Sequence, residues 1–138
     1  MVHLILGERG SGKSKKIIEM ANNQVENCTG DIVFIDDDKR PIHELHRNIR
    51  FVTTSDYRIT SSTIFYGFLC GIMSQNYDIQ FIFIDGVSNI IEQENLGDMK
   101  DLFLNLKEIA EKWNIEFYIS ANASEEIPEF LKEFICVK

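Results

Sequence analysis

Residues 2–14 read VHLILGERGSGKS, and this stretch decides the fold of the chain. It begins with an apolar run from Val2 to Leu6, which is typical of a buried β-strand. Glycines then recur, and from Lys13 to Asn27 apolar residues fall on one side of a helical pattern. A strand, a glycine-rich turn and a helix in direct succession predict an α/β fold with parallel strands.

The turn itself has the residue types that hold phosphate. Gly7, Gly10 and Gly12 can adopt backbone conformations closed to other residues, so the main chain can wrap closely around an anion. Its N–H groups then point inward at a helix N-terminus, where negative charge is favoured. We therefore expect residues 7–14 to bind the phosphates of a nucleotide.

The residues that follow complete the pattern GxxxxGK[ST]. Lys13 is expected to contact the β- and γ-phosphates, and the hydroxyl of Ser14 is expected to ligate Mg²⁺. The predicted cofactor-binding segment comprises Gly7, Glu8, Arg9, Gly10, Ser11, Gly12, Lys13 and Ser14. Glu8 and Arg9 occupy variable positions, to which we assign no role.

Strand-like runs and helical patterns alternate along the rest of the chain. Predicted strands cover residues 2–6, 32–35, 81–84, 115–119 and 134–137, with a minor extra strand at 51–52. Predicted helices cover residues 13–27, 41–48, 61–75, 96–113 and 124–132, and the third long one has an apolar stripe from Leu96 to Trp113. Because the strands are continuously apolar, both faces of the sheet should be covered. We expect a three-layer α/β/α sandwich with a five-stranded, mostly parallel sheet.

A magnesium site needs an acid besides Ser14, and the end of another apolar strand is the expected place. Asp85 directly follows the apolar run at residues 81–84 and is our candidate. The alternative is that Asp85 and Gly86 only form a turn.

These two motifs resemble the Walker A and Walker B sequences of P-loop NTPases. The order of elements is similar to the RecA-like (ASCE) branch, which implies the strand order 5-1-4-3-2. The chain also resembles short, stand-alone bacterial ATP-binding proteins, some of which are labelled pilus-retraction ATPases. The resemblance implies ATP and Mg²⁺ as cofactors and catalytic roles for Lys13 and Asp85. It also places Ser120 and Asn122 near the γ-phosphate or the attacking water, unless they form only a capping turn.

One residue departs from the pattern of the hydrolysing members. They carry Glu directly after the Walker B Asp, whereas this chain has Gly86. Glu92 and Glu94 follow too far downstream to replace it unless a loop folds back. We therefore expect slow intrinsic hydrolysis.

An acidic triplet ends the second predicted strand. Asp36, Asp37 and Asp38 should lie at the same sheet edge as the glycine loop, where one carboxylate could act as the base of a small-molecule kinase. The competing interpretation is a turn that caps the following helix.

The charge distribution bears on the partners. The net charge is −8, and residues 70–138 carry all of the excess acid. Such a chain is a poor non-specific binder of nucleic acid, because phosphate contacts dominate that binding. Arg40, Arg47, Arg50 and Arg58 follow the second strand; one could act on the nucleotide of a neighbouring subunit, or all could be solvated.

The remaining features concern location. Cys28, Cys70 and Cys136 form no CxxC pair, which favours buried free thiols in a reducing compartment. No run reaches the length of a membrane span. We expect one nucleotide-binding domain over residues 1–138, in the cytoplasm.

Three functions compete. The first is an ATP-binding protein that hydrolyses ATP slowly or switches a partner protein or its own self-association with nucleotide state. The second is the small-molecule kinase, and the third is a structural module without nucleotide. No [NT]KxD motif of GTPases occurs, which favours ATP over GTP.

Overall fold

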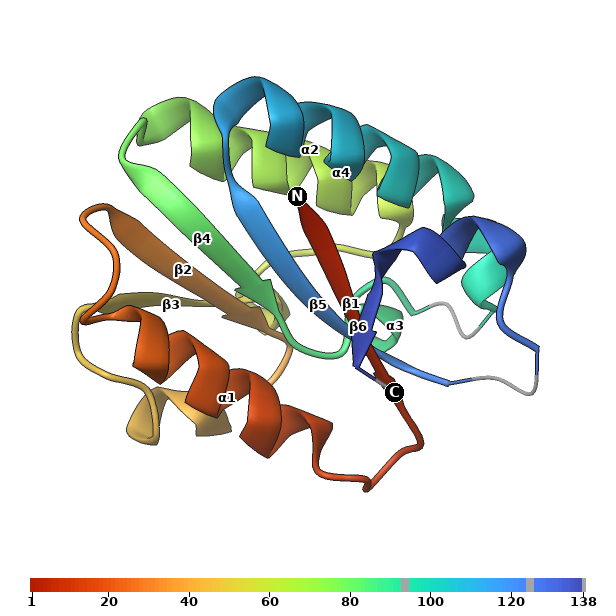
Figure 1. Cartoon of the computed structure of the whole chain (residues 1–138), viewed down its shortest axis with the longest axis horizontal. Coiled ribbons are helices and arrows are strands. Elements are labelled where there is room, and N and C mark those ends of the chain that lie inside the picture. The colour runs from red at the N-terminus through yellow and green to blue at the C-terminus, as the bar shows by residue number, and fades with distance from the viewer. Residues whose placement is uncertain (93–94, 124–125, 138) are drawn as a thin grey trace.

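A six-stranded parallel sheet forms the centre of the computed structural model, which describes residues 1–92, 95–123 and 126–137. The strands are β1 (Val2–Gly7), β2 (Asp31–Asp36), β3 (Ile49–Thr53), β4 (Ile79–Ile84), β5 (Glu116–Asn122) and β6 (Ile135–Val137). Every neighbouring pair is parallel, and the order across the sheet is β3-β2-β4-β5-β1-β6 (Figure 1). The α/β class with a parallel sheet is confirmed.

The expected five-stranded sheet with the order 5-1-4-3-2 is wrong, because there are six strands. The difference is β3, for which the sequence suggested only a minor strand at residues 51–52. This strand pairs with β2 from Ile49 to Thr53 and becomes the edge of the sheet. Its charged Arg50 interrupts the apolar run, which concealed the strand in the sequence.

Helices lie on both faces of the sheet. The longer ones are α1 (Lys13–Gln24), α2 (Ser62–Gln75) and α4 (Lys100–Trp113). Helix α1 covers one face, where Ile17 packs in the same cluster as Phe83; α2 and α4 cover the other, where Phe65 and Phe103 pack with Ile119 (Figure 1). This arrangement fits three layers.

Short helical turns replace several predicted helices. They are α3 (Val87–Ile90) and the 3-10 turns η1 (Arg40–His43), η2 (Thr54–Asp56), η3 (Leu96–Met99) and η4 (Glu129–Phe134). The helices predicted at 41–48 and 124–132 are therefore wrong in type and extent, and residues 124 and 125 of the second lie outside the described part. Helix α1 ends three residues before the predicted Asn27, and α3 was not predicted.

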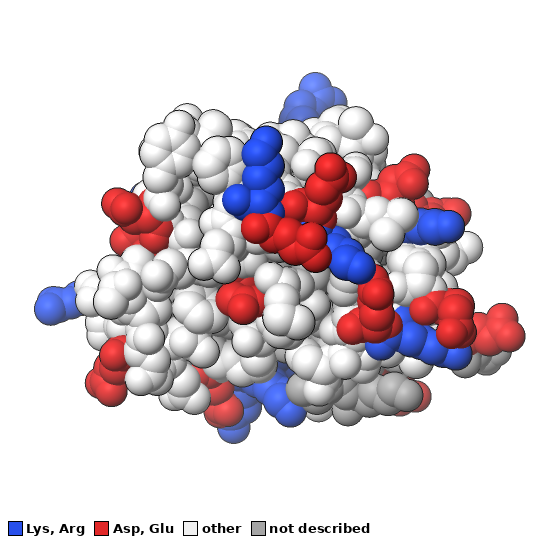
Figure 2. Space-filling model, turned by 45° about the horizontal axis from the view of Figure 1, so that its top comes forward, with Lys and Arg blue, Asp and Glu red and all other residues white. Residues whose placement is uncertain are grey.

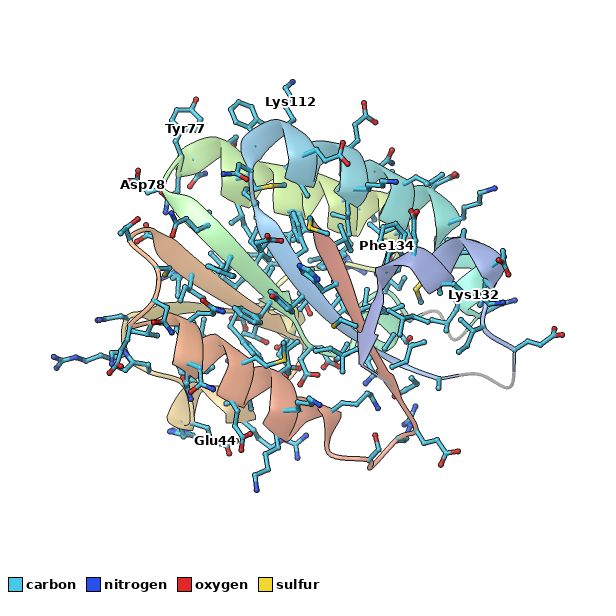
Figure 3. All side chains as sticks on the ribbon, viewed as in Figure 1. Glu44, Tyr77, Asp78, Lys112, Lys132 and Phe134 are labelled. Atoms are coloured by element: carbon cyan, nitrogen blue, oxygen red, sulfur yellow. The ribbon has the colours of Figure 1, made fainter. Side chains whose placement is uncertain are left out.

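The predicted apolar stripe fails at one end. Trp113 is 50% exposed, since it closes α4 at the end of the molecule. There it stacks on Tyr77 at 6.1 Å between ring centroids, with Lys112 at 5.6 Å from its ring (Figure 3). At the other end of α4, Phe103 meets Phe134 of η4 at 5.7 Å, so the stripe is buried there.

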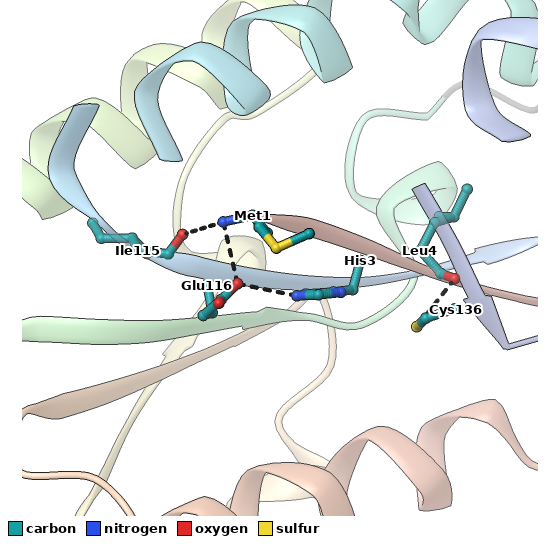
Figure 4. A network of polar contacts seen from close by, with 6 residues as sticks. All are labelled: Met1, His3, Leu4, Ile115, Glu116 and Cys136. Carbon is teal, nitrogen blue, oxygen red and sulfur yellow. Dashed lines mark hydrogen bonds and ion pairs between the residues drawn. The ribbon is translucent and has the colours of Figure 1, made fainter. Parts of the chain in front are cut away.

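The amino ends of β1 and β5 are tied together. The terminal ammonium of Met1 donates to the carbonyl of Ile115 at 3.1 Å and pairs with Glu116 at 3.1 Å (Figure 4). Glu116 also meets Nε2 of His3 at 3.0 Å, and His3 stacks on Tyr118 as a packed residue. Although burial by itself raises the pKa of Glu116, these two partners hold it below its usual range.

The surface mixes charges of both signs. Figure 2 shows acidic and basic side chains interspersed on one face, with broad uncharged areas between them. None of the three cysteines forms a disulfide with a described residue, but the prediction that all are buried is wrong: Cys136 is exposed, and Cys28 and Cys70 are half-buried. No described helix has the length and apolar character needed to cross a membrane.

Candidate functional site

The carboxyl edge of the sheet gathers the predicted site residues, because all strands run in the same direction. Gly7 ends β1, Asp36 ends β2, Asp85 follows β4, and Ser120 lies near the end of β5. Side chains alternate along a strand, so the last three share the α1 face with the aromatic residues two positions earlier. Those aromatic residues are Phe34, Phe83 and Tyr118, which pack beneath α1.

The glycine loop joins β1 to α1. Gly10 and Gly12 have φ angles of 81° and 89°, in the left-handed region that favours glycine. The amide of Ser11 donates to the carbonyl of Glu8 at 3.1 Å and closes the turn. Gly12 directly precedes α1 and has no side chain to cap it, so the first amides of this helix stay available to an anion.

Lys13 reaches back over this loop. Its Nζ donates to the carbonyl oxygen of Glu8 at 2.9 Å, so the ammonium group lies above the turn. Burial lowers the pKa of Lys13, attraction by Asp85 opposes that lowering, and the positive charge of Arg9 adds to it. Because Asp85 directly follows β4, this attraction between Lys13 and Asp85 links the glycine loop electrostatically to the end of β4.

A cavity of about 420 Å³ lies beside the loop. It is within the size range of small-molecule sites. Its lining comprises Ile5, Leu6, Gly7, Glu8, Ser11, Gly12, Lys13, Lys16, Ala123 and Ile127. The lining therefore combines polar loop atoms and two lysines with apolar side chains.

Asp85 and Ser120 form a buried pair. Asp85 is 5% exposed and Ser120 is fully buried. The hydroxyl of Ser120 donates to Oδ1 of Asp85 at 2.6 Å and accepts from the amide of Gly86 at 2.8 Å. These two hydrogen bonds fix the orientation of the carboxylate across the β4–β5 boundary. Such a carboxylate has the chemistry to ligate Mg²⁺.

Asp36 differs from its neighbours in the triplet. Burial raises the pKa of Asp36 to about 9, and its interactions with Asp37 and Asp85 act in the same direction. Asp36 is therefore protonated at neutral pH. Asp38 caps a turn instead: Oδ1 accepts from the amide of Arg40 and Oδ2 from its guanidinium, and these bonds hold the pKa of Asp38 below its usual range. The capping interpretation thus describes Asp38, while Asp36 belongs to the site.

Other predicted residues lie at or beyond the rim. Ser14 is exposed in the first turn of α1, as are Glu8 and Arg9 in the loop. Asn122 pairs with Gly7 in the β1–β5 register, so it stands where the loop begins. Among the described residues, no three His, Cys, Asp or Glu side chains converge on a metal position.

Arg40, Arg47, Arg50 and Glu92 do not join the site. Arg40 pairs with Asp38, whereas Arg47 and Arg50 line a different cavity beside β3. Glu92 is exposed, with a φ angle of 54°, and Glu94 lies outside the described residues.

Sequence reasoning missed three polar residues. Thr53 is buried at the end of β3, in register with Asp36, and the missed strand concealed it. Ser88 is buried in α3 with no hydrogen-bond partner for its hydroxyl in the described structure, and no sequence signal marks it. Lys16 lines the cavity, and its position three residues after Lys13 on a helix could have indicated this.

Comparison with known proteins adds nothing to this geometry: no protein-family model matches the chain, and no curated protein matches it.

Proposed function

We propose that the chain is a P-loop protein of the RecA-like branch that binds ATP with Mg²⁺. One observation carries the proposal: a glycine loop with two left-handed glycines lies at the uncapped start of α1, and its lysine is coupled electrostatically to buried Asp85. A turn that served only to connect β1 to α1 would need neither the lysine nor the buried acid.

The roles of the residues follow from their chemistry. The amides of residues 7–14 would hold the phosphates, and Lys13 would exchange the carbonyl of Glu8 for phosphate oxygens. Ser14 and Asp85 would hold Mg²⁺ together with phosphate oxygens and water, because Mg²⁺ takes few protein ligands in such sites. Ser120 positions Asp85 through its hydrogen bond.

Slow hydrolysis or a nucleotide-dependent switch suits this site better than fast turnover. Gly86 supplies no side chain to polarise water, and its left-handed φ of 72° starts the turn of α3. No Glu follows Asp85 directly, and the nearby carboxyl of Asp36 is protonated. A partner protein or a second copy would then respond to bound ATP. We place this activity in the cytoplasm, since the cysteines form no disulfide within the described residues.

Equilibrium binding of a fluorescent, non-hydrolysable ATP analogue tests the proposal. Lys13→Ala should weaken magnesium-dependent binding by about 100-fold, because it removes the charge on the β- and γ-phosphates. Lys15→Ala is the matched control, since Lys15 is exposed on the same helix and does not line the cavity. Asp85→Asn should abolish the effect of Mg²⁺ on affinity. Equal affinity of the Lys13 and Lys15 variants, or no binding by the wild type, would contradict the proposal.

A small-molecule kinase is the second candidate, and the position of Asp36 favours it. This carboxyl is buried on the same face as Asp85, where a substrate hydroxyl could meet the γ-phosphate. Because Asp36 is protonated at neutral pH, it can accept a proton only after a bound cation lowers its pKa. Consumption of ATP that starts when a metabolite mixture is added, and stops in Asp36→Asn, would support the kinase.

A further inference from the structure

The edge strand β3 offers an unused row of main-chain groups. Within the described residues it pairs with β2 alone, and the amide of Ile49 donates to the carbonyl of His46 at 2.9 Å, so the alternate N–H and C=O groups left facing away from the sheet lie from Arg50 to Thr53. An exposed edge of this kind is a template on which another strand can pair.

Both faces of this strand are bordered by one large cavity of about 1040 Å³. On the α1 face its lining includes Leu45 and Phe51, and on the α2 face Val52, Phe68 and Ile72; Ile42 also lines it. Ile42 is 52% exposed, so part of this apolar lining faces solvent. A strand added to β3 would send its side chains alternately toward the two faces, and each would meet apolar surface.

The charge beside the strand is positive in an acidic protein. Arg47 and Arg50 are exposed, line this cavity and make no ion pair with any described residue. Residues 39–58 carry five basic and two acidic side chains, whereas the whole chain has a net charge of −8. Unpaired arginines repel a basic strand and attract a strand that carries carboxylates.

We propose that β3 is a docking site for an extended, acidic segment of a partner protein, which pairs with it as a seventh strand. Main-chain pairing favours a polypeptide over a nucleic acid, because a phosphate backbone has no N–H groups to match the strand edge. Acidic side chains on the segment would pair with Arg47 and Arg50, and its apolar side chains would fill the cavity. This site is independent of the glycine loop, so it stands whether or not the chain binds ATP.

Selection from a displayed library of random peptides of about eight residues, on the immobilised full chain, tests the proposal. The expected winners alternate apolar residues with Asp or Glu. Arg47→Glu and Arg50→Glu should each weaken a winning peptide about tenfold and together select basic peptides instead. Lys100→Glu is the matched control, because it makes the same charge change at an exposed position on α4.

N-methylation of the winning peptide tests strand pairing without altering the protein. Only alternate N–H groups of an added strand face β3, so methylating one set should cost at least about tenfold in affinity while the other set leaves binding intact. Three results would overturn the proposal: no enrichment, equal enrichment on the double arginine variant, or equal effects of the two methylation patterns. Binding of an oligothymidine that depends on Arg50 and displaces the peptides would show a nucleic-acid surface instead.

Discussion

Asp36 is a carboxylic acid held in its neutral form by the fold. It is 6% exposed at the end of β2, and Asp85, another buried acid, lies close enough to raise its pKa. Its Oδ1 still accepts from the amide of Asp38 at 3.0 Å, so the group is satisfied as a hydrogen-bond acceptor. At any pH at which this carboxyl ionises in the unfolded chain, holding it neutral in the folded state lowers the free energy of unfolding.

Replacing Asp36 by Asn should stabilise the protein at alkaline pH. The pKa of Asp36 rises from 3.8 to about 9 on folding, so the folded state binds the extra proton between these values and loses stability as pH rises. Asp36→Asn removes this loss and keeps the acceptor for Asp38. Its advantage in free energy of unfolding should be absent near pH 4 and reach a few kcal/mol, roughly 2–4, near pH 8.

Urea unfolding of both proteins across this pH range measures the difference. Asp38→Asn is the control of opposite sign, because the pKa of Asp38 is lowered on folding. In the wild type, ionised Asp38 stabilises the folded state above the pKa that this group has in the unfolded chain, and that stabilisation is lost as pH falls. Asp38→Asn removes it, so this variant should be no more stable than the wild type at pH 8. A pH-independent difference between wild type and Asp36→Asn would refute the assignment of Asp36 as a neutral acid.

Among the elements, α4 contributes its apolar stripe to the core. Leu102, Phe103, Leu106 and Ala110 are buried on one side, at the spacing of an amphipathic helix. The helix ends at Trp113, and the next residue, Asn114, has a left-handed φ of 55°, a common way to close a helix. Its buried face packs on α2 and the sheet, so α4 covers the side opposite the candidate site.

Truncating two adjacent residues of α4 should give very different results. Phe103→Ala removes a fully buried ring that contacts Phe134, and we expect a loss of about 3–5 kcal/mol in the free energy of unfolding. Leu104 is 43% exposed, so Leu104→Ala should cost less than about 1 kcal/mol. Thermal or urea unfolding followed by circular dichroism compares them. Similar losses would mean that the buried face of α4 is misassigned.

For the whole molecule, strand order determines what the site contains. β5 lies between β1 and β4, so Ser120 stands between the glycine loop and Asp85. The connection through α1 carries the chain from β1 past β5 and β4 to β2, which brings Asp36 to the same edge. The candidate site therefore draws on four strands and would couple ligand binding to the stability of the entire sheet.

ATP with Mg²⁺ should raise the thermal midpoint of the wild type. A ligand at about 100 times its Kd adds about 2.7 kcal/mol to the free energy of unfolding, which corresponds to a shift on the order of 5–10 °C. Differential scanning fluorimetry measures the shift, with Lys13→Ala expected to lose it and Lys15→Ala to keep it. An identical shift in all three proteins would indicate binding elsewhere.

Local spacing and backbone freedom were enough to predict the glycine loop, the strand and helix that flank it and the acid after residues 81–84. Three features emerge only in the folded chain: Ser120 orients Asp85, Asp36 is neutral, and β3 is an edge strand. The physical reason is that hydrogen bonding, burial and strand pairing join residues far apart in the chain. Ser120 and Asp85 are 35 positions apart, and their contact exists only once β4 and β5 lie side by side.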